Sequence, residues 1–277
     1  MSMFDHTIVA VHFESPYQPL LDTLSELHKL GAQRFTLVDV LRIDDVEALS
    51  KAHRDEARRR LEQRRADLQA AGFEVDIQQP EGFPAPELAK IGRGYGAQLI
   101  LLGSRGEGLL REFYHGSTVL ELARQTALPV LVERIDPDPA TYSHGETLSR
   151  PLLATDFSGP AGAAQSLALE LGEQVGELLL LHVTDEDHRT QGQDQLQQFA
   201  AEAEGRGIRV TTRLEVGTPS RVIHSVAERE GSSVAILGKR GDGPAREVAL
   251  GSTAQQACRH CPCSVLLVPH QQGIWNR

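Results

Sequence analysis

The chain has 277 residues, of which 40% are hydrophobic and 24% charged, values typical of a globular protein with one or two domains. Its formal net charge is −10, and the acidic residues are spread over both halves, which argues against a general nucleic-acid-binding face. No apolar run is long enough to span a membrane, the N-terminus lacks the basic start of a secretory signal, and the three cysteines do not make a disulfide framework. We therefore expect a cytoplasmic protein that has no membrane span and binds no nucleic acid.

Short apolar runs alternate with amphipathic stretches along the whole chain. In the first half we expect strands at 8–11, 34–40, 73–78, 97–103 and 128–132. The helices of that half are expected around 20–27, from about 50 to 71, from Pro86, and after Gly116. The second half repeats this order, with strands expected at 152–155, 177–183, 208–216, 232–238 and 263–269. Its helices are expected around 164–171, from about 193 to 203, from Pro219, and after Gly251.

This alternation predicts the fold class. Strands that alternate with helices form a parallel sheet covered by helices on both faces. The stretch RIDPDPATYSHGETLSRP between the halves is rich in Pro, Ser, Thr and Asp, a composition typical of linkers. We therefore predict two similar α/β domains, residues 1–138 and 151–277, joined by a linker at 139–150.

A glycine pattern occurs once in each half. GSRGEGLLREFYHGST (103–118) and GKRGDGPAREVALGST (238–253) each follow the fourth predicted strand and lead into a helix. Ligands of open parallel sheets bind at the carboxyl ends of the strands, and glycine lets the backbone approach a ligand closely. The N–H groups and the dipole of a helix start favour a phosphate, and Lys239 and Arg240 add positive charge in the second copy. The pattern thus predicts a two-part phosphate clamp.

The spacing excludes two better-known phosphate motifs. No Gly-Lys-Ser/Thr ends either block, so neither is a Walker A loop. The blocks also follow the fourth strand and not the first, which excludes the dinucleotide-binding fingerprint. One such glycine block alone would indicate only a tight turn, but two copies, each with Gly-Ser-Thr at a helix start, favour a phosphate site.

The chain resembles a tandem universal stress protein with two UspA-type domains along nearly its whole length. Both blocks fit the pattern of that family's ATP-binding members, which is Gly, two residues, Gly, nine residues, Gly, then Ser or Thr. The resemblance implies a five-stranded parallel sheet in the order 3-2-1-4-5 in each domain, with helices on both faces. It also implies pairing of the two domains within the chain, formation of a homodimer, and a regulatory role in a stress response.

The resemblance further implies an adenine-nucleotide site in the second domain. LLATDFSGPA (152–161) resembles the family's first strand and the following loop, where an aspartate, here Asp156, contacts the adenosine portion. Val183 stands where the family's backbone contacts the adenine edge, and the second glycine block matches the ribose- and phosphate-binding positions. The expected nucleotide-binding residues are Ala154, Thr155, Asp156, Val183, Gly238, Arg240, Gly241, Gly251, Ser252 and Thr253.

The first domain departs from this pattern. His12 stands where the second domain has Asp156, and an imidazole brings no negative charge for a metal or an amine. The glycine block itself is intact. We expect a weaker or altered site there, made of His12, Val40, Gly103, Arg105, Gly106, Gly116, Ser117 and Thr118.

The sequence indicates binding and not efficient catalysis. A phosphotransferase needs carboxylates that hold a metal, a positioned nucleophile and groups that stabilise the transferred charge. Asp156 is the one carboxylate well placed, and no catalytic base or arginine finger is evident, so no catalytic residue is assigned. We expect a protein that binds ATP, alone or with Mg²⁺, hydrolyses it slowly or not at all, and acts on an unidentified regulated protein through the flap between Gly241 and Gly251. A dimerisation scaffold without nucleotide and a slow ATPase or phosphotransferase are the alternatives, and AMP or a cyclic nucleotide remains open as the ligand.

Two further patterns favour structural roles. Cys258, Cys261 and Cys263 have a spacing that suggests zinc, but the sequence offers no second ligand pair, so we predict small buried side chains and no metal site. The basic run at 58–65 is interleaved with Glu62 and lies on an amphipathic stretch, which predicts a solvated helix surface and not an anion-binding patch.

Overall fold

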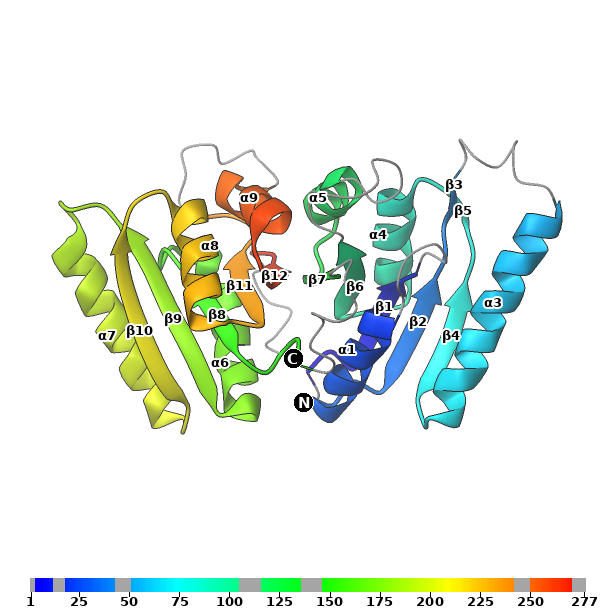
Figure 1. Ribbon diagram of the computed structural model, residues 1–277, viewed down its shortest axis with the longest axis horizontal. Helices are drawn as coiled ribbons and strands as arrows, with labels where there is room; N and C mark the ends of the chain where they lie inside the picture. Colours follow the sequence, from blue (N-terminus) through cyan, green and yellow to red (C-terminus); the bar gives the residue numbers. More distant parts are fainter. Residues whose placement is uncertain are drawn as a thin grey trace. The chain divides into compact units, whose positions relative to one another are not determined.

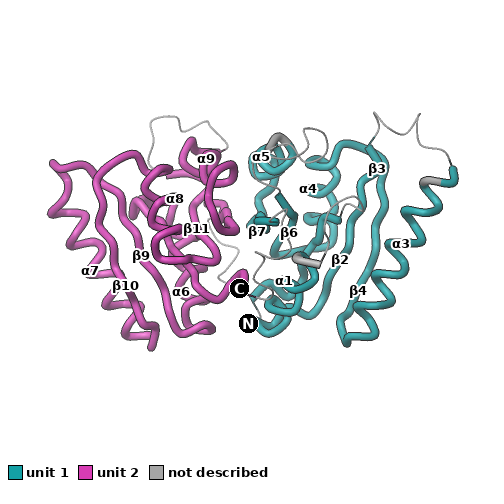
Figure 2. The backbone as a smooth tube through the Cα atoms, in the orientation of Figure 1, with its two compact units in different colours: residues 1–104, 111–145 teal, residues 105–110, 146–277 magenta. Residues whose placement is uncertain are grey.

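A computed structural model of the chain describes residues 3–11, 18–42, 51–104, 116–135, 146–241 and 250–270. These residues divide into two compact units, one made of the described residues up to 135 and the other of those from 146 onward (Figure 2). The predicted domain end at residue 138 and most of the predicted linker lie outside the described residues.

The first unit is built on a parallel sheet. Its strands are β1 (His6–Ala10), β2 (Arg34–Val38), β4 (Glu74–Gln78), β6 (Leu99–Ser104) and β7 (Val130–Arg134). They lie in the order β4-β2-β1-β6-β7, which confirms the predicted 3-2-1-4-5 arrangement. A separate two-stranded sheet, β3 (Leu41–Arg42) with β5 (Glu81–Gly82), was not predicted, because two-residue strands leave no periodic pattern in a sequence.

The second unit repeats the arrangement. Its strands are β8 (Pro151–Ala154), β9 (Glu177–Thr184), β10 (Arg209–Val216), β11 (Val234–Gly238) and β12 (Ser264–Val268). They lie in the order β10-β9-β8-β11-β12, and each neighbouring pair is parallel. This order places the carboxyl ends of β8 and β11 side by side, at the point where the winding direction of the chain reverses.

Helices cover both faces of each sheet (Figure 1). The first unit has α1 (Gln18–Lys29), α3 (Lys51–Ala70), α4 (Pro84–Gly94) and α5 (Gly116–Gln125). The second unit has a short 3₁₀ turn (Gly159–Ala161), α6 (Gly162–Val175), α7 (Arg189–Gly205), α8 (Pro219–Glu230) and α9 (Ser252–His260).

Two helices begin earlier than predicted. The α4 helix begins at Pro84 and not at Pro86, and the extended backbone of Phe83 precedes it. Proline fits this first position because the N–H that it lacks would have no partner inside the helix. The α7 helix begins at Arg189 and not at about residue 193. The earlier start was not predicted, because the first turn is polar and carries no apolar periodicity.

The central strands form the core. The side chains of β1 and those of Val234 to Leu237 in β11 are almost fully buried. Strands covered by helices on both faces bury both sets of side chains, which is why Ile8–Ala10 and Val234–Leu237 are apolar without alternation. Each fully buried Leu or Ile contributes roughly 1.5–3 kcal/mol to stability, so the strand ends are held on a rigid base.

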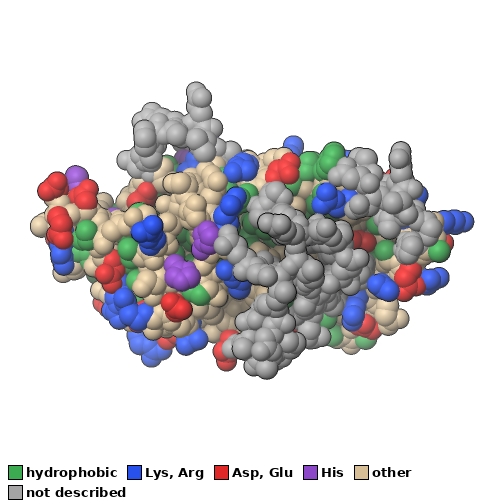
Figure 3. Space-filling model, turned by 45° about the horizontal axis from the view of Figure 1, so that its top comes forward, with side chains coloured by type: hydrophobic (Ala, Val, Ile, Leu, Met, Phe, Trp, Pro, Cys, Tyr) green, Lys and Arg blue, Asp and Glu red, His purple; other side chains and the backbone are tan. Residues whose placement is uncertain are grey.

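The predicted solvated helix surface is confirmed in α3. Leu61 and Leu68 are buried, whereas Arg58 and Arg60 are ion-paired on the helix surface with Glu62 and Glu56. Acidic and basic side chains are interspersed on the face that Figure 3 shows. No helix in the described ranges is long and apolar enough to cross a membrane.

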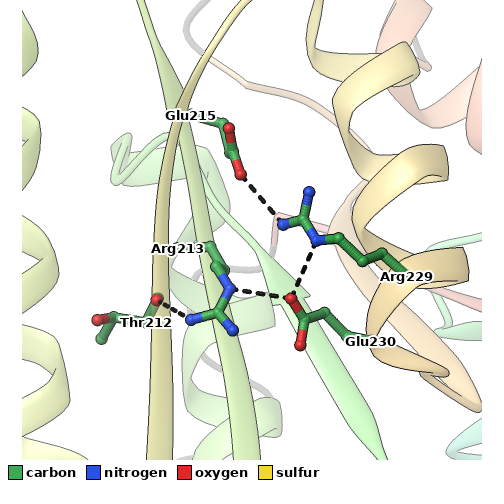
Figure 4. Close-up of polar contacts among 5 residues, drawn as sticks. All are labelled: Thr212, Arg213, Glu215, Arg229 and Glu230. Atoms are coloured by element: carbon green, nitrogen blue, oxygen red, sulfur yellow. Dashed lines mark hydrogen bonds and ion pairs between the residues drawn. The ribbon is translucent and has the colours of Figure 1, made fainter.

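An ion-pair network lies on the edge strand β10 (Figure 4). Glu230 of α8 accepts hydrogen bonds from Arg213 Nε at 3.0 Å and from Arg229 Nε at 3.2 Å, and Arg229 also reaches Glu215 at 3.1 Å. The hydrogen bond from Arg213, followed by that from Arg229, lowers the pKa of Glu230. The network links α8 to β10, an edge strand in which every residue is exposed or half-buried.

The three cysteines are buried, as predicted. Cys258 lies on the inner face of α9, and Cys261 follows the last turn of that helix. The sulfur atoms of Cys261 and Cys263 are 3.4 Å apart, directly before β12.

Candidate functional site

A cavity of about 450 Å³ lies at the carboxyl ends of the strands in the second unit. Residues from β8, β9, β11, α8 and α9 line it. All ten residues expected for the second-domain site are among them, and the lining consists of Ala154, Thr155, Asp156, Ala161, Leu181, Val183, Pro219, Ile223, Leu237, Gly238, Lys239, Arg240, Gly241, Gly251, Ser252, Thr253, Ala254 and Gln255.

The turn after β8 holds Asp156 in place. The Thr155 hydroxyl oxygen accepts hydrogen bonds from the Phe157 N–H and from Gln165 Nε2, both at 3.0 Å. Asp156 Oδ1 accepts hydrogen bonds from the N–H of Ser158 at 3.0 Å and from its hydroxyl at 2.6 Å. Phe157 adopts a left-handed backbone with φ of 56°, so this is a tight and specific turn. The carboxylate is therefore presented to the cavity in a fixed orientation.

Two glycines of the loop after β11 have no room for a Cβ. A Cβ built on Gly238 would lie 2.8 Å from the carbonyl oxygen of Arg240 and 3.4 Å from the Cα of Ala161. A Cβ on Gly241 would collide with the second carboxylate oxygen of Asp156. Glycine at positions 238 and 241 thus allows the end of β11 and the residues after it to pack against the 3₁₀ turn and Asp156.

The start of α9 forms the other side of the cavity. Gly251 has an extended backbone and precedes the helix without a side-chain cap, and its N–H donates to the carbonyl of Lys239 at 2.8 Å. This hydrogen bond joins the helix start to the glycine loop. The N–H groups of a first helical turn have no acceptor within the helix and form the positive end of its dipole. With the hydroxyls of Ser252 and Thr253, they make this end of the cavity suited to an anion.

Apolar residues also line the cavity. They include Val183 of β9, Ile223 of α8, Leu237 of β11 and Pro219 at the start of α8. Ile223 and Pro219 were not predicted as site residues from the sequence. The sequence could have indicated that α8 begins near the site, because this helix directly follows the carboxyl end of β10. Only the packing of α8 places Ile223 in the cavity.

Two further residues of this region were not assigned to the site from the family pattern. His182 is buried next to the cavity, and its Nδ1 lies 2.8 Å from the carbonyl oxygen of Thr155, which helps to fix the β8 turn. Lys239 lines the cavity and is only 4% exposed. Burial lowers the pKa of Lys239 to about 7, and the nearby Cys258 opposes this shift.

The first unit differs at the corresponding strand end. His12, Arg105 and Gly106 lie outside the described residues, as does the side chain of Ser117. Val40, Gly116 and Thr118 are described, at the end of β2 and in the first turn of α5. A Cβ on Gly103 would collide with the side chain of Ile135, so this glycine accommodates apolar packing.

The sequence profile of the Universal stress protein family matches residues 3–134 and 149–269. The chain belongs to the universal stress protein family. Each compact unit corresponds to one universal stress domain, and the two matches account for the repeat of strands and glycine blocks.

Individual members of the family are similar to this chain in fold and in parts of the sequence. The crystal structure of a universal stress protein from Archaeoglobus fulgidus superimposes with a TM-score of 0.77 at 23% identity, covering 96% of this chain and 99% of that one, which shows the shared fold. Universal stress protein Sll1388 of Synechocystis is 32% identical over 85 residues, which are 31% of this chain and 55% of that protein. Universal stress protein MJ0577 of Methanocaldococcus jannaschii is 32% identical over 78 residues, which are 28% of this chain and 48% of that protein. The matches thus span about half the length of these two relatives.

Proposed function

We propose that the second unit of this universal stress protein binds an adenine nucleotide, with ATP, alone or with Mg²⁺, as the principal ligand. The protein then acts as a nucleotide-dependent regulator that hydrolyses ATP slowly or not at all. The observation that carries the proposal is the cavity itself, which combines an anion-binding end with an apolar wall at the switch point of a parallel sheet.

The polar end suits the phosphate groups. The cavity is lined by the first turn of α9, with Ser252 and Thr253, and by the basic residues Lys239 and Arg240. The apolar lining residues Val183 and Ile223 suit the flat apolar faces of a purine. The cavity volume of about 450 Å³ lies within the range of roughly 300–1,000 Å³ that is usual for small-molecule sites.

The lining supports binding in preference to phosphoryl transfer. Asp156 is the one carboxylate that lines the cavity in the described ranges, and its Oδ1 already accepts two hydrogen bonds from Ser158. Efficient transfer requires several groups that hold metal, position the nucleophile and stabilise charge. Residues 242–249, which make up most of the flap predicted between Gly241 and Gly251, lie outside the described residues.

Calorimetric titration of the full chain with ATP tests the proposal. We expect a dissociation constant below about 100 μM, equivalent to roughly −5.5 kcal/mol. Gly241→Val should weaken binding by at least about tenfold, or roughly 1.4 kcal/mol, because the new side chain would collide with the Asp156 carboxylate and displace it. The matched control is Gly205→Val on α7, where a Cβ meets no neighbouring atom. Nucleotide retained on purification would appear as absorbance near 260 nm after denaturation.

Two results would contradict the proposal. Absence of binding of ATP, ADP, AMP and cyclic AMP to the wild-type chain would favour a dimerisation scaffold. Steady-state release of ADP faster than about one per minute would favour an enzyme, since typical enzymes turn over near 10 per second.

A further inference from the structure

A buried histidine contacts the turn that carries Asp156. His182 of β9 is 7% exposed and, within the described ranges, is not one of the residues that line the cavity. Its Nδ1 atom lies 2.8 Å from the carbonyl oxygen of Thr155, the residue directly before Asp156. Because a carbonyl oxygen only accepts hydrogen bonds, Nδ1 carries the proton and donates. The histidine therefore acts on the turn and not on the interior of the cavity.

Two neighbours fix the imidazole ring of His182. The ring of Phe157, which belongs to the same turn, lies with its centroid 5.1 Å from that of the imidazole. The α7 helix approaches so closely that a Cβ built on Gly192 would lie 2.7 Å from Cδ2 and 2.9 Å from Nε2 of the ring. Both distances are shorter than an ordinary van der Waals contact, so glycine at position 192 makes room for the histidine.

The first unit has a different residue at this position. Asp39 stands there where His182 stands in the second unit, in each case one residue after the last one that pairs with the first strand of the unit. The Asp39 carboxylate accepts a hydrogen bond from Gln79 Nε2 at 3.0 Å. A carboxylate has no N–H to donate to a backbone carbonyl. The sheet of a universal stress domain thus forms without this histidine, which favours a role in the cavity of the second unit.

We propose that His182 is a positioning residue of the nucleotide site, which holds the carbonyl of Thr155, thereby sets the orientation of Asp156, and controls ATP affinity without contacting the ligand. The inference rests on the proposed function, because it requires a nucleotide in the cavity. It also extends the site to α7, since Gly192 leaves the space that the imidazole occupies. A substitution on that helix should therefore alter the cavity from a position that does not line it.

Two substitutions separate the hydrogen bond from packing. His182→Leu retains a side chain of similar size without a donor and should weaken ATP binding about five- to tenfold. His182→Asn is smaller, but its side-chain Nδ2 can take the place of Nδ1 as donor, so it should bind ATP within about threefold of the wild type. Calorimetry of the full chain measures both. A His182→Leu variant that binds as tightly as the wild type, or more tightly than His182→Asn, overturns the inference while the proposed function stands.

A double-mutant cycle tests whether His182 acts through the Asp156 carboxylate. Asp156→Ala alone should weaken ATP binding about tenfold. If His182 acts by positioning Asp156, adding His182→Leu to this variant should weaken binding by no more than about a further twofold. Two effects that multiply to about fiftyfold or more would give His182 a role independent of Asp156 and overturn the inference.

The α7 helix provides a matched pair that leaves His182 itself unchanged. Gly192→Ala places a Cβ against the imidazole and should weaken ATP binding about threefold or more. Gly205→Ala on the same helix meets no neighbouring atom and should bind ATP like the wild type. Urea denaturation verifies that each variant is folded. Equal ATP affinity of the two glycine variants would overturn the inference alone, whereas a wild-type chain that binds no adenine nucleotide removes the proposed function and this inference with it.

Discussion

Both universal stress domains carry a glycine in the last two residues of the fourth strand, Gly103 in β6 and Gly238 in β11, yet the surroundings of the two glycines differ. In the second unit, Gly238 lies against the backbone of Ala161 at the edge of a cavity. In the first unit, Gly103 lies against the side chains of Ile135 and Leu20. One glycine thus permits close approach of two backbone segments, and the other makes room for apolar side chains.

The neighbouring strand shows a second difference. Gly103 pairs in register with Glu133 of β7, and Gly238 pairs with Val268 of β12. Glu133 is buried and accepts a hydrogen bond from the hydroxyl of Thr23 on α1 at 2.9 Å. Thr23 corresponds to Leu167, at the 144-residue separation that also relates Ile8 to Leu152. A polar pair in the first unit therefore replaces an apolar pair in the second, and a shared motif does not by itself imply a shared environment.

The largest expected effect comes from adding a methyl group to each glycine. Gly238→Ala should weaken ATP binding about a hundredfold, or roughly 2.7 kcal/mol, because backbone atoms must move to admit the Cβ. Gly103→Ala should leave that binding unchanged and lower the free energy of unfolding by about 1–3 kcal/mol, because it overpacks the core around Ile135. Calorimetry and chemical denaturation of both variants measure the two effects, and equal loss of ATP binding in both would remove the contrast between the units.

The polar pair of the first unit is tested by Thr23→Val. Removing a hydrogen bond to a buried carboxylate should lower the free energy of unfolding by about 2 kcal/mol. Ser25→Ala on the exposed side of the same helix is the control and should change stability by less than about 0.5 kcal/mol. Urea denaturation measures both, and a Thr23→Val variant as stable as the control would show that the pair has no structural role.

Exchange of the residues that follow the first strands tests the ranking of the two sites. Asp156→Ala should weaken ATP binding about tenfold, or roughly 1.4 kcal/mol, while Asp194→Ala on the exposed face of α7 should not change it. His12→Asp should strengthen any binding by the first unit. Calorimetric stoichiometry distinguishes the sites, and an unchanged affinity in Asp156→Ala would show that the ranking is wrong.

The smallest expected effect concerns the edge of the second sheet. The pKa of Glu230 is lowered first by Arg213 and then by Arg229, so its ion pairs stabilise the fold above the ordinary pKa of a glutamate. That contribution is lost as the pH falls through the lowered pKa. Glu230→Gln should therefore reduce the melting temperature slightly at pH 7 and leave it unchanged at strongly acidic pH. A larger difference at low pH than at pH 7 would contradict this assignment.

Much of the architecture could be predicted from the sequence. The apolar runs of β1, β6, β8 and β11 and the helices between them are local patterns, and the resemblance to a known family supplied their order in the sheet. The glycine blocks could be placed at the ends of the fourth strands because those strands are apolar up to Gly103 and Gly238. Helix starts in polar segments, such as that of α7, were less accurate because they leave no periodic signal.

The sequence by itself determined that the chain contains two copies of one α/β unit and that each copy carries a glycine loop before a helix. Only the tertiary structure decided that Ile135 packs against Gly103 in one copy, and that Ile223 and the buried Lys239 line a cavity in the other. The physical reason is that periodicity and turn chemistry act between near neighbours in the chain. Burial and close approach depend instead on residues far apart in the sequence, which only the packing of helices on the sheet brings together.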